Sequence, residues 1–234
     1  MPVFQSTLRR TLVSASFWPT LLVTLGASWV AAQLVSASLG PTESFLAEIR
    51  QGCMLFGGLL VLSLAEPLQV GREAREGILL LRAVRANNLG LLARWLGLLF
   101  ATLPAVLAAA IASGGLPSSM LALISQLAVL AAGGLLLGSF LERGRLVPAL
   151  WVLAVVGQLR PWLARDGWGA AVAWLLPDLA GLQEGKMLGL LHAFLWVVGA
   201  LCLTRWRLLA VAARGPWPTG VPKKAAGYEG GTES

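Results

Sequence analysis

The sequence predicts an all-α polytopic membrane protein with six transmembrane helices. Of its 234 residues 57% are apolar and only 12% are charged, and the mean hydropathy is +0.75. A soluble domain averages about 45–50% apolar and about 25% charged residues. A chain with so few charges lacks the polar surface that a water-soluble protein exposes, so soluble, disulfide-stapled and disordered classes fit it poorly.

Charge-free runs locate the spans, because a charge at the centre of a bilayer costs about 2.5–3.5 kcal/mol on insertion scales. The run 95–141 is too long for one helix of about 20 residues, and the Gly-Gly-Leu-Pro sequence at 114–117 divides it into a helical hairpin. The other full spans are expected within residues 11–42, 45–65 and 187–204.

The region 146–181 is expected to form a split fifth span. Residues 146–159 and 168–177 are free of charge, but each stretch is too short to cross about 30 Å of hydrocarbon as a straight helix. We expect a helix that breaks near the outer face, followed by a re-entrant apolar segment that is buried by protein. The alternative is an ordinary span that ends near Trp162, followed by an interfacial helix.

The distribution of Lys and Arg predicts the orientation. With the N-terminus inside, 14 of the 18 basic residues lie on the inner side, so both the N- and C-termini are expected to be cytoplasmic. This bias accounts for the net charge of +7 without a nucleic-acid partner. Residues 1–212 are expected to form a single transmembrane domain that starts with an amphipathic elbow helix at 3–12, and residues 213–234 a disordered cytoplasmic tail.

Catalytic chemistry is not expected in this chain. His192 is the only histidine, and it is expected to be packed or to face a lumen. Cys53 and Cys202 are expected to lie at different membrane depths and to be free thiols. Two such distant cysteines and one histidine do not make up a set of metal ligands. The sequence at 181–187 looks like a phosphate-binding loop but has one residue too few between its glycines and lacks the Ser or Thr for magnesium. We therefore expect no catalytic residue, no metal and no cofactor.

The inner loop 67–90 is the most charged stretch of the chain, and its charges alternate with leucines. Pro67 is expected to end the second span, and Gly77 can divide the loop into two short helical pieces. A short helix that is apolar nearly all round, with an arginine edge, suits insertion into a groove on another protein. The alternative is an ordinary positive-inside loop.

The string at residues 72–85, REAREGILLLRAVR, resembles the R-E-x-x-x-G-[TI]-x-x-L signature of ABC-2-type transporter permeases. In that family the segment follows the second span and forms the coupling helix that contacts a separate ATPase subunit. The resemblance implies an ATPase-coupling role for Arg72, Glu73, Arg75, Glu76 and Gly77, with Arg82 and Arg85 at the edge of the groove.

Two further motifs follow the order of that family. The sequence at 176–182, LPDLAGL, resembles the L-P-[ND]-L element between the broken fifth span and the sixth, and residues 204–208 resemble the basic ending. The resemblance implies a permease subunit in a bacterial cytoplasmic (inner) membrane, paired with a second copy or a homologous permease. ATP and Mg²⁺ would bind to the partner ATPase, and export would be the direction. Haem-exporter permeases are a sister alternative.

Two other groups of residues are candidate sites. Three glycines of one span, of which Gly134 and Gly138 have the Gly-x-x-x-Gly spacing, predict close helix contacts within one subunit or between two: Gly133, Gly134 and Gly138. Charged residues around the split fifth span are candidates for an outer gate or, as the simpler interpretation, for ion pairs at the interface: Arg160, Arg165, Asp166 and Asp178.

Two other function classes remain open on the sequence alone. A six-span subunit that captures a small molecule for uptake would need a polar pocket fed from outside, and the short external segments offer few side chains for one. A non-transporting membrane scaffold or assembly factor has no need of a charged coupling loop or a split span.

Overall fold

The computed structural model describes residues 2–37, 43–72, 89–115, 119–163, 173–183 and 187–213. Every regular element within these ranges is helical. The elements in chain order are α1 (Pro2–Leu12), α2 (Phe17–Ala37), α3 (Glu43–Leu64), the short 3₁₀ turn η1 (Glu66–Leu68), α6 (Leu89–Ala112), α7 (Met120–Phe140), α8 (Arg143–Leu163), α10 (Leu179–Gln183) and α11 (Met187–Ala213).

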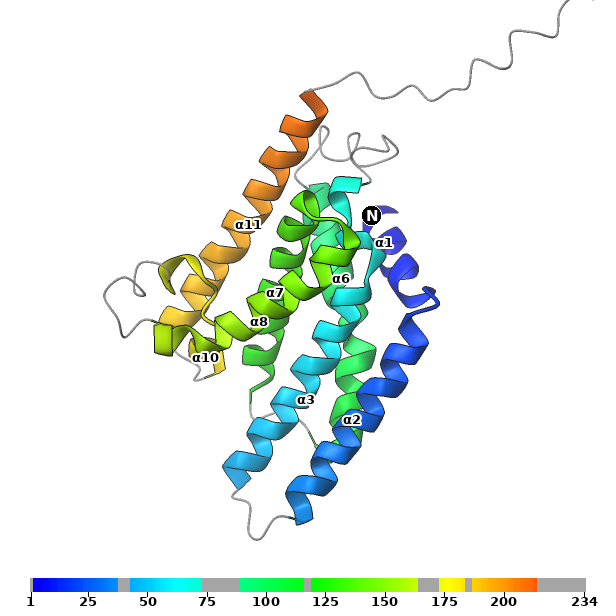
Figure 1. The fold of residues 1–234 in the computed structure, drawn as a ribbon, viewed down its shortest axis with the longest axis vertical. Coiled ribbons are helices and arrows are strands. Elements are labelled where there is room, and N and C mark those ends of the chain that lie inside the picture. The colour runs from blue at the N-terminus through cyan, green and yellow to red at the C-terminus, as the bar shows by residue number, and fades with distance from the viewer. Residues whose placement is uncertain are drawn as a thin grey trace, which may run out of the picture.

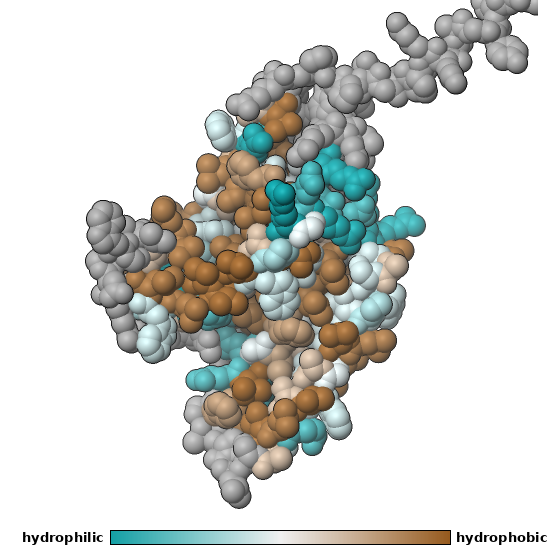
Figure 2. Space-filling model, viewed as in Figure 1, coloured by the Kyte–Doolittle hydropathy of each residue, from teal (hydrophilic) through white to brown (hydrophobic). Residues whose placement is uncertain are grey.

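Six of these helices, α2, α3, α6, α7, α8 and α11, are long and apolar enough to cross a membrane. The prediction of an all-α, six-span membrane protein is therefore confirmed. Figure 2 shows hydrophobic side chains over most of the visible flank of the bundle, as expected of a surface that faces lipid.

The hairpin between α6 and α7 forms where the sequence predicts it. Gly114 has a φ of +78°, a left-handed conformation that glycine adopts without steric cost and that turns the chain out of α6. Ser119 then caps α7, because its side chain accepts a hydrogen bond of 3.2 Å from the backbone N–H of Ala122.

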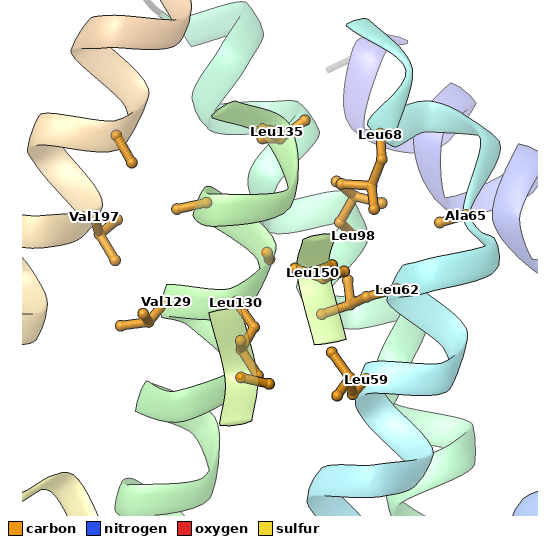
Figure 3. Close-up of a cluster of buried hydrophobic side chains, with 14 of the residues drawn as sticks. Leu59, Leu62, Ala65, Leu68, Leu98, Val129, Leu130, Leu135, Leu150 and Val197 are labelled. Atoms are coloured by element: carbon orange, nitrogen blue, oxygen red, sulfur yellow. The ribbon is translucent and has the colours of Figure 1, made fainter. Parts of the chain in front are cut away.

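Helix α7 is the centre of the bundle. In the most apolar 18-residue stretch of α7, 61% of the residues are buried, whereas the corresponding share is 17% in α2 and 22% in α8 and α11. Leu130 and Leu135 of α7 meet Leu62 of α3, Leu98 of α6 and Leu150 of α8 in the main core (Figure 3). A change in the position of α7 therefore affects several of its neighbours.

The region predicted to form a split fifth span contains α8 (Arg143–Leu163) and a shorter described segment after it. Helix α8 is continuous to Leu163 and is long enough to cross, and the chain is described again from Ala173 to Gln183, which we call the return segment. The return segment packs against α7, α8 and α11, and its Leu179 and Leu182 are fully buried. Its second half, α10, is therefore covered by helices, whereas Trp174 and Leu175 in its first half are 68% and 78% exposed.

The predicted coupling loop begins at one end of the bundle, after η1. Figure 1 shows α1, η1, the start of α6 and the end of α11 near this end, whereas α2 and α3 connect at the opposite end. We call the first the terminal end and the second the distal end. The terminal end is the one that the sequence predicts to be cytoplasmic. Helix α1 exposes Arg9 and Arg10 and buries Thr7 and Thr11 against the bundle. Beyond Ala213, the predicted tail lies outside the described residues.

Candidate functional site

The predicted coupling loop begins at the terminal end. Of the candidate residues in this loop, the structure describes Arg72, which is exposed and is the last residue described before position 73. The other members of the set lie outside the described residues: Glu73, Arg75, Glu76, Gly77, Arg82 and Arg85. The structure does describe residues 65–72, which include the end of the span and the first residues of the predicted loop. We call this segment the loop root.

Glycines of α7 hold the loop root in place. Leu68 of η1 is fully buried, and its backbone carbonyl lies where a Cβ on Gly138 would stand. A Cβ on Gly134 would lie 2.9 Å from Cδ2 of Leu68, and one on Gly71 would lie 2.7 Å from the carbonyl oxygen of Ser139. The two backbones approach this closely because Gly71 and Gly138 have no Cβ, and Gly134 leaves room for the side chain of Leu68.

The predicted helix-packing glycines thus have two kinds of neighbour. Gly134 and Gly138 receive the loop root, whereas a Cβ on Gly133 would lie 2.5 Å from Leu153 of α8 and 3.0 Å from Trp196 of α11. All of these contacts are within one chain. Gly71 and Leu68 are the members that sequence reasoning missed. Pro67 marked the end of the span, but nothing in the sequence shows which helix the next residue meets.

A cavity of about 450 Å³ lies at the loop root, between the end of α3 and the turn that joins α7 to α8. It is lined by Gln69, Arg72, Leu141, Glu142, Arg143 and Gly144. Two arginines and one carboxylate around an open cleft can bind a protein segment that presents both acidic and basic side chains. The largest hydrophilic area visible in Figure 2 lies at this end of the bundle.

An ion pair holds the return segment to α8. Arg160 pairs with Asp178, and its Nε also donates a 2.6 Å hydrogen bond to the carbonyl of Ala173. The guanidinium lies 5.9 Å from the ring centroid of Trp174. Asp178 in turn accepts a 2.9 Å hydrogen bond from the N–H of Gly181, at the first turn of α10. Of the four charged residues predicted here, Arg160 and Asp178 are thus brought together.

The other two candidates of that group, Arg165 and Asp166, lie outside the described residues.

A buried glutamine forms a second connection to the return segment. Gln126 of α7 is fully buried, and its Nε2 donates a 2.7 Å hydrogen bond to the carbonyl of Leu179. Its Oε1 accepts a 3.4 Å hydrogen bond from Nε2 of Gln51 on α3, which is also buried. Sequence reasoning missed this pair, although an amide within a charge-free span is itself a sign of an internal hydrogen bond.

Helix α7 connects the loop root to the return segment. Gly138 contacts the loop root and Gln126 contacts the return segment, and their separation of 12 positions corresponds to about 18 Å of helix. The loop root and the return segment therefore contact the same helix at two positions.

Among the described residues, no three His, Cys, Asp or Glu side chains cluster to hold a metal ion, and Cys53 and Cys202 are free cysteines. The chain matches no protein-family model, no curated protein and no solved structure. In the part of the chain that the structure describes, a charged cleft and the return segment both lie against the same central helix, α7.

Proposed function

We propose that this chain is the membrane-spanning subunit of an ATP-driven ABC transporter of the ABC-2 type, and that it acts as an exporter in a bacterial cytoplasmic membrane. A separate ATPase subunit binds ATP and Mg²⁺ and inserts against the loop 67–90 and the cleft at the loop root. Two copies of the chain, or the chain and a homologous permease, enclose the translocation path.

The single observation that supports this proposal most is the attachment of the loop root to α7. A loop that only carried positive charge would need no close backbone packing, yet Leu68 and Gly71 lie against the backbone of Gly138 and Ser139. Force applied to the loop by a partner would therefore move α7 itself. The bound ATPase can shift the equilibrium between two arrangements of the spans only by the difference in its affinity for them.

Charge reversal at the start of the loop tests the coupling role. We expect Arg72→Glu or Glu73→Arg to lower the stimulated ATPase activity of the complex about tenfold, because like charges then face each other across the subunit contact. The activity is measured on the purified complex in lipid nanodiscs, together with the amount of chain inserted in the membrane, which is expected to be unchanged.

Arg9→Glu is the matched control, because Arg9 is an exposed arginine at the same end of the bundle and lies outside the loop root. Wild-type stimulation in both loop variants would contradict the coupling role. An equal loss in the Arg9→Glu variant would show that net charge at this end, and not the loop, determines the activity.

A further inference from the structure

A small cavity lies at the distal end of the bundle, between α2, α3 and the turn that follows α6 (Figure 1). Its volume is about 280 Å³, near the lower end of the range of about 300–1,000 Å³ that is typical of ligand sites. Its polar lining residues are Gln33 and Ser36 of α2, Arg50 of α3, and Ser113 after α6. A cavity of this size and lining suits a small polar group.

Arg50 carries the only charge among the residues that line this cavity. It lies five positions after the start of the apolar stretch Phe45–Leu64, which corresponds to about 8 Å of helix. An arginine so close to the end of a span usually extends its head toward the bilayer surface, where water and lipid heads solvate the charge. Arg50 is instead bound to the turn after α6.

That turn fixes the guanidinium on one edge and one face. Its Nε donates a 3.3 Å hydrogen bond to the carbonyl of Ser113, and a Cβ on Gly115 would lie 3.3 Å from Cζ and Nη1 of Arg50. Within the described residues, Nη1 and Nη2 have no hydrogen-bond or ion-pair partner. Arg50 is only half-buried, and both nitrogens keep accessible surface beside the cavity. The other edge of the guanidinium is therefore available to a ligand.

Gln33 supplies a further donor, and the two serines do not. The side chain of Gln33 is exposed, and its amide nitrogen is free to donate as far as the described residues go. The hydroxyl of Ser36 already donates to the carbonyl of Gln33 at 2.9 Å, and that of Ser113 donates to the carbonyl of Ala109 at 2.7 Å. No carboxylate is among the described residues that line the cavity, so nothing in its lining repels an anion.

We propose that this cavity binds one phosphate group, whose oxygens accept hydrogen bonds from Nη1 and Nη2 of Arg50 and from Nε2 of Gln33. The two terminal nitrogens of a guanidinium match the spacing of two phosphate oxygens. The bound anion also offsets the cost of a charge near hydrocarbon. The phosphate belongs either to a phospholipid of the adjacent leaflet or to a soluble phosphate compound that enters from water. This inference goes beyond the transport proposal and holds whether or not an ATPase binds the loop.

The test uses the purified full chain, freed of lipid in a neutral maltoside detergent, and two phosphate probes. Native mass spectrometry counts bound dioleoyl phosphatidylglycerol, and the comparison lipid is dioleoylglycerol, which has the same acyl chains and no phosphate. Equilibrium dialysis measures the binding of radiolabelled inorganic phosphate. We expect saturable binding of one phosphate per chain, and dioleoylglycerol should bind about tenfold more weakly than phosphatidylglycerol.

The two probes separate the two sources of phosphate. If the site takes a lipid head, phosphatidylglycerol binds and inorganic phosphate does not displace it. If the site takes a soluble phosphate, inorganic phosphate binds by itself and displaces the lipid.

Arg50→Gln should raise the Kd of the bound probe about tenfold, because it removes the charge and the paired donors. Gln33→Leu changes an exposed position of α2 and should raise the Kd about threefold, through the loss of one neutral hydrogen bond. Arg9→Gln is the matched control, since it makes the same substitution at an exposed arginine of the terminal end, and its Kd should equal that of the wild type. Far-UV circular dichroism checks that each variant keeps its helices. If Arg50→Gln does not fold, Gln33→Leu and the comparison with dioleoylglycerol decide the question.

Three results would overturn the proposal. Binding of neither probe would show that the cavity takes no phosphate. Binding with the wild-type Kd in both Arg50→Gln and Gln33→Leu would place the phosphate elsewhere on the chain. Equal binding of phosphatidylglycerol and dioleoylglycerol, with no binding of inorganic phosphate, would show that the chain recognises acyl chains and not the phosphate.

Discussion

Gly138→Ala is expected to lower the melting temperature of the detergent-solubilised chain by about 10 °C. The added Cβ would stand at the carbonyl oxygen of Leu68, which is backbone and cannot rotate away. Overpacking of this kind costs about 1–3 kcal/mol, and contact with backbone places Gly138 at the upper end. About 3 kcal/mol corresponds to about 6–12 °C in a chain of this length. Tryptophan fluorescence during heating measures the change.

Gly199→Ala provides the control, since the same methyl group meets no atom there. Its melting temperature should stay the same or rise, because alanine stabilises a helix relative to glycine by up to about 1 kcal/mol. The expected outcome is a lower melting temperature for Gly138→Ala and no decrease for Gly199→Ala. Equal melting temperatures would mean that the loop root is not seated on α7 as described.

Asp178→Ala is the second substitution with a large expected effect. It removes the partner of Arg160 and also the acceptor for the N–H of Gly181. The side chains of the pair are only 14% and 21% exposed, so a charge left without its partner is poorly solvated. Breaking a fully buried pair costs about 3–5 kcal/mol, and partial exposure reduces this to about 2 kcal/mol here.

Asp178→Asn separates the two contributions. Its side-chain oxygen can still accept from Gly181, so it loses only the ion pair and should destabilise the chain less than Asp178→Ala. A double-mutant cycle with Arg160→Gln then isolates the interaction of the two charges. The free energies of unfolding come from denaturant titrations in detergent. A coupling energy of zero would show that the pair does not hold the return segment.

The spans could be predicted because each rests on a local pattern. Charge-free runs longer than a bilayer crossing define helices whatever their neighbours are, and the Gly-Gly-Leu-Pro sequence at 114–117 places the hairpin turn. The extent of α8 was harder to predict, since Arg160 suggested that the apolar run stops at 159. The structure shows that the helix includes Arg160, whose charge is paired with Asp178 of the return segment.

The contacts of the candidate site depend on tertiary packing, which the sequence pattern does not contain. The spacing of Gly134 and Gly138 predicts that another segment packs closely against them. It does not show that this segment is the loop root, whose Leu68 contacts both glycines. Likewise, Gln126 was visible as a polar residue in an apolar span, yet its partner Leu179 is 53 residues away. Short-range rules place elements along the chain and leave such pairings undetermined.

The most direct test of the central claim is to purify the tagged full chain from the membranes of its native host in mild detergent and to identify its companions by mass spectrometry. The account predicts a stoichiometric subunit of the size of an ABC ATPase, which is lost when Arg72 and Glu73 are both reversed in charge. A preparation in which the folded chain has no ATPase subunit would contradict the transport proposal and favour a small-molecule-capturing subunit or a membrane scaffold.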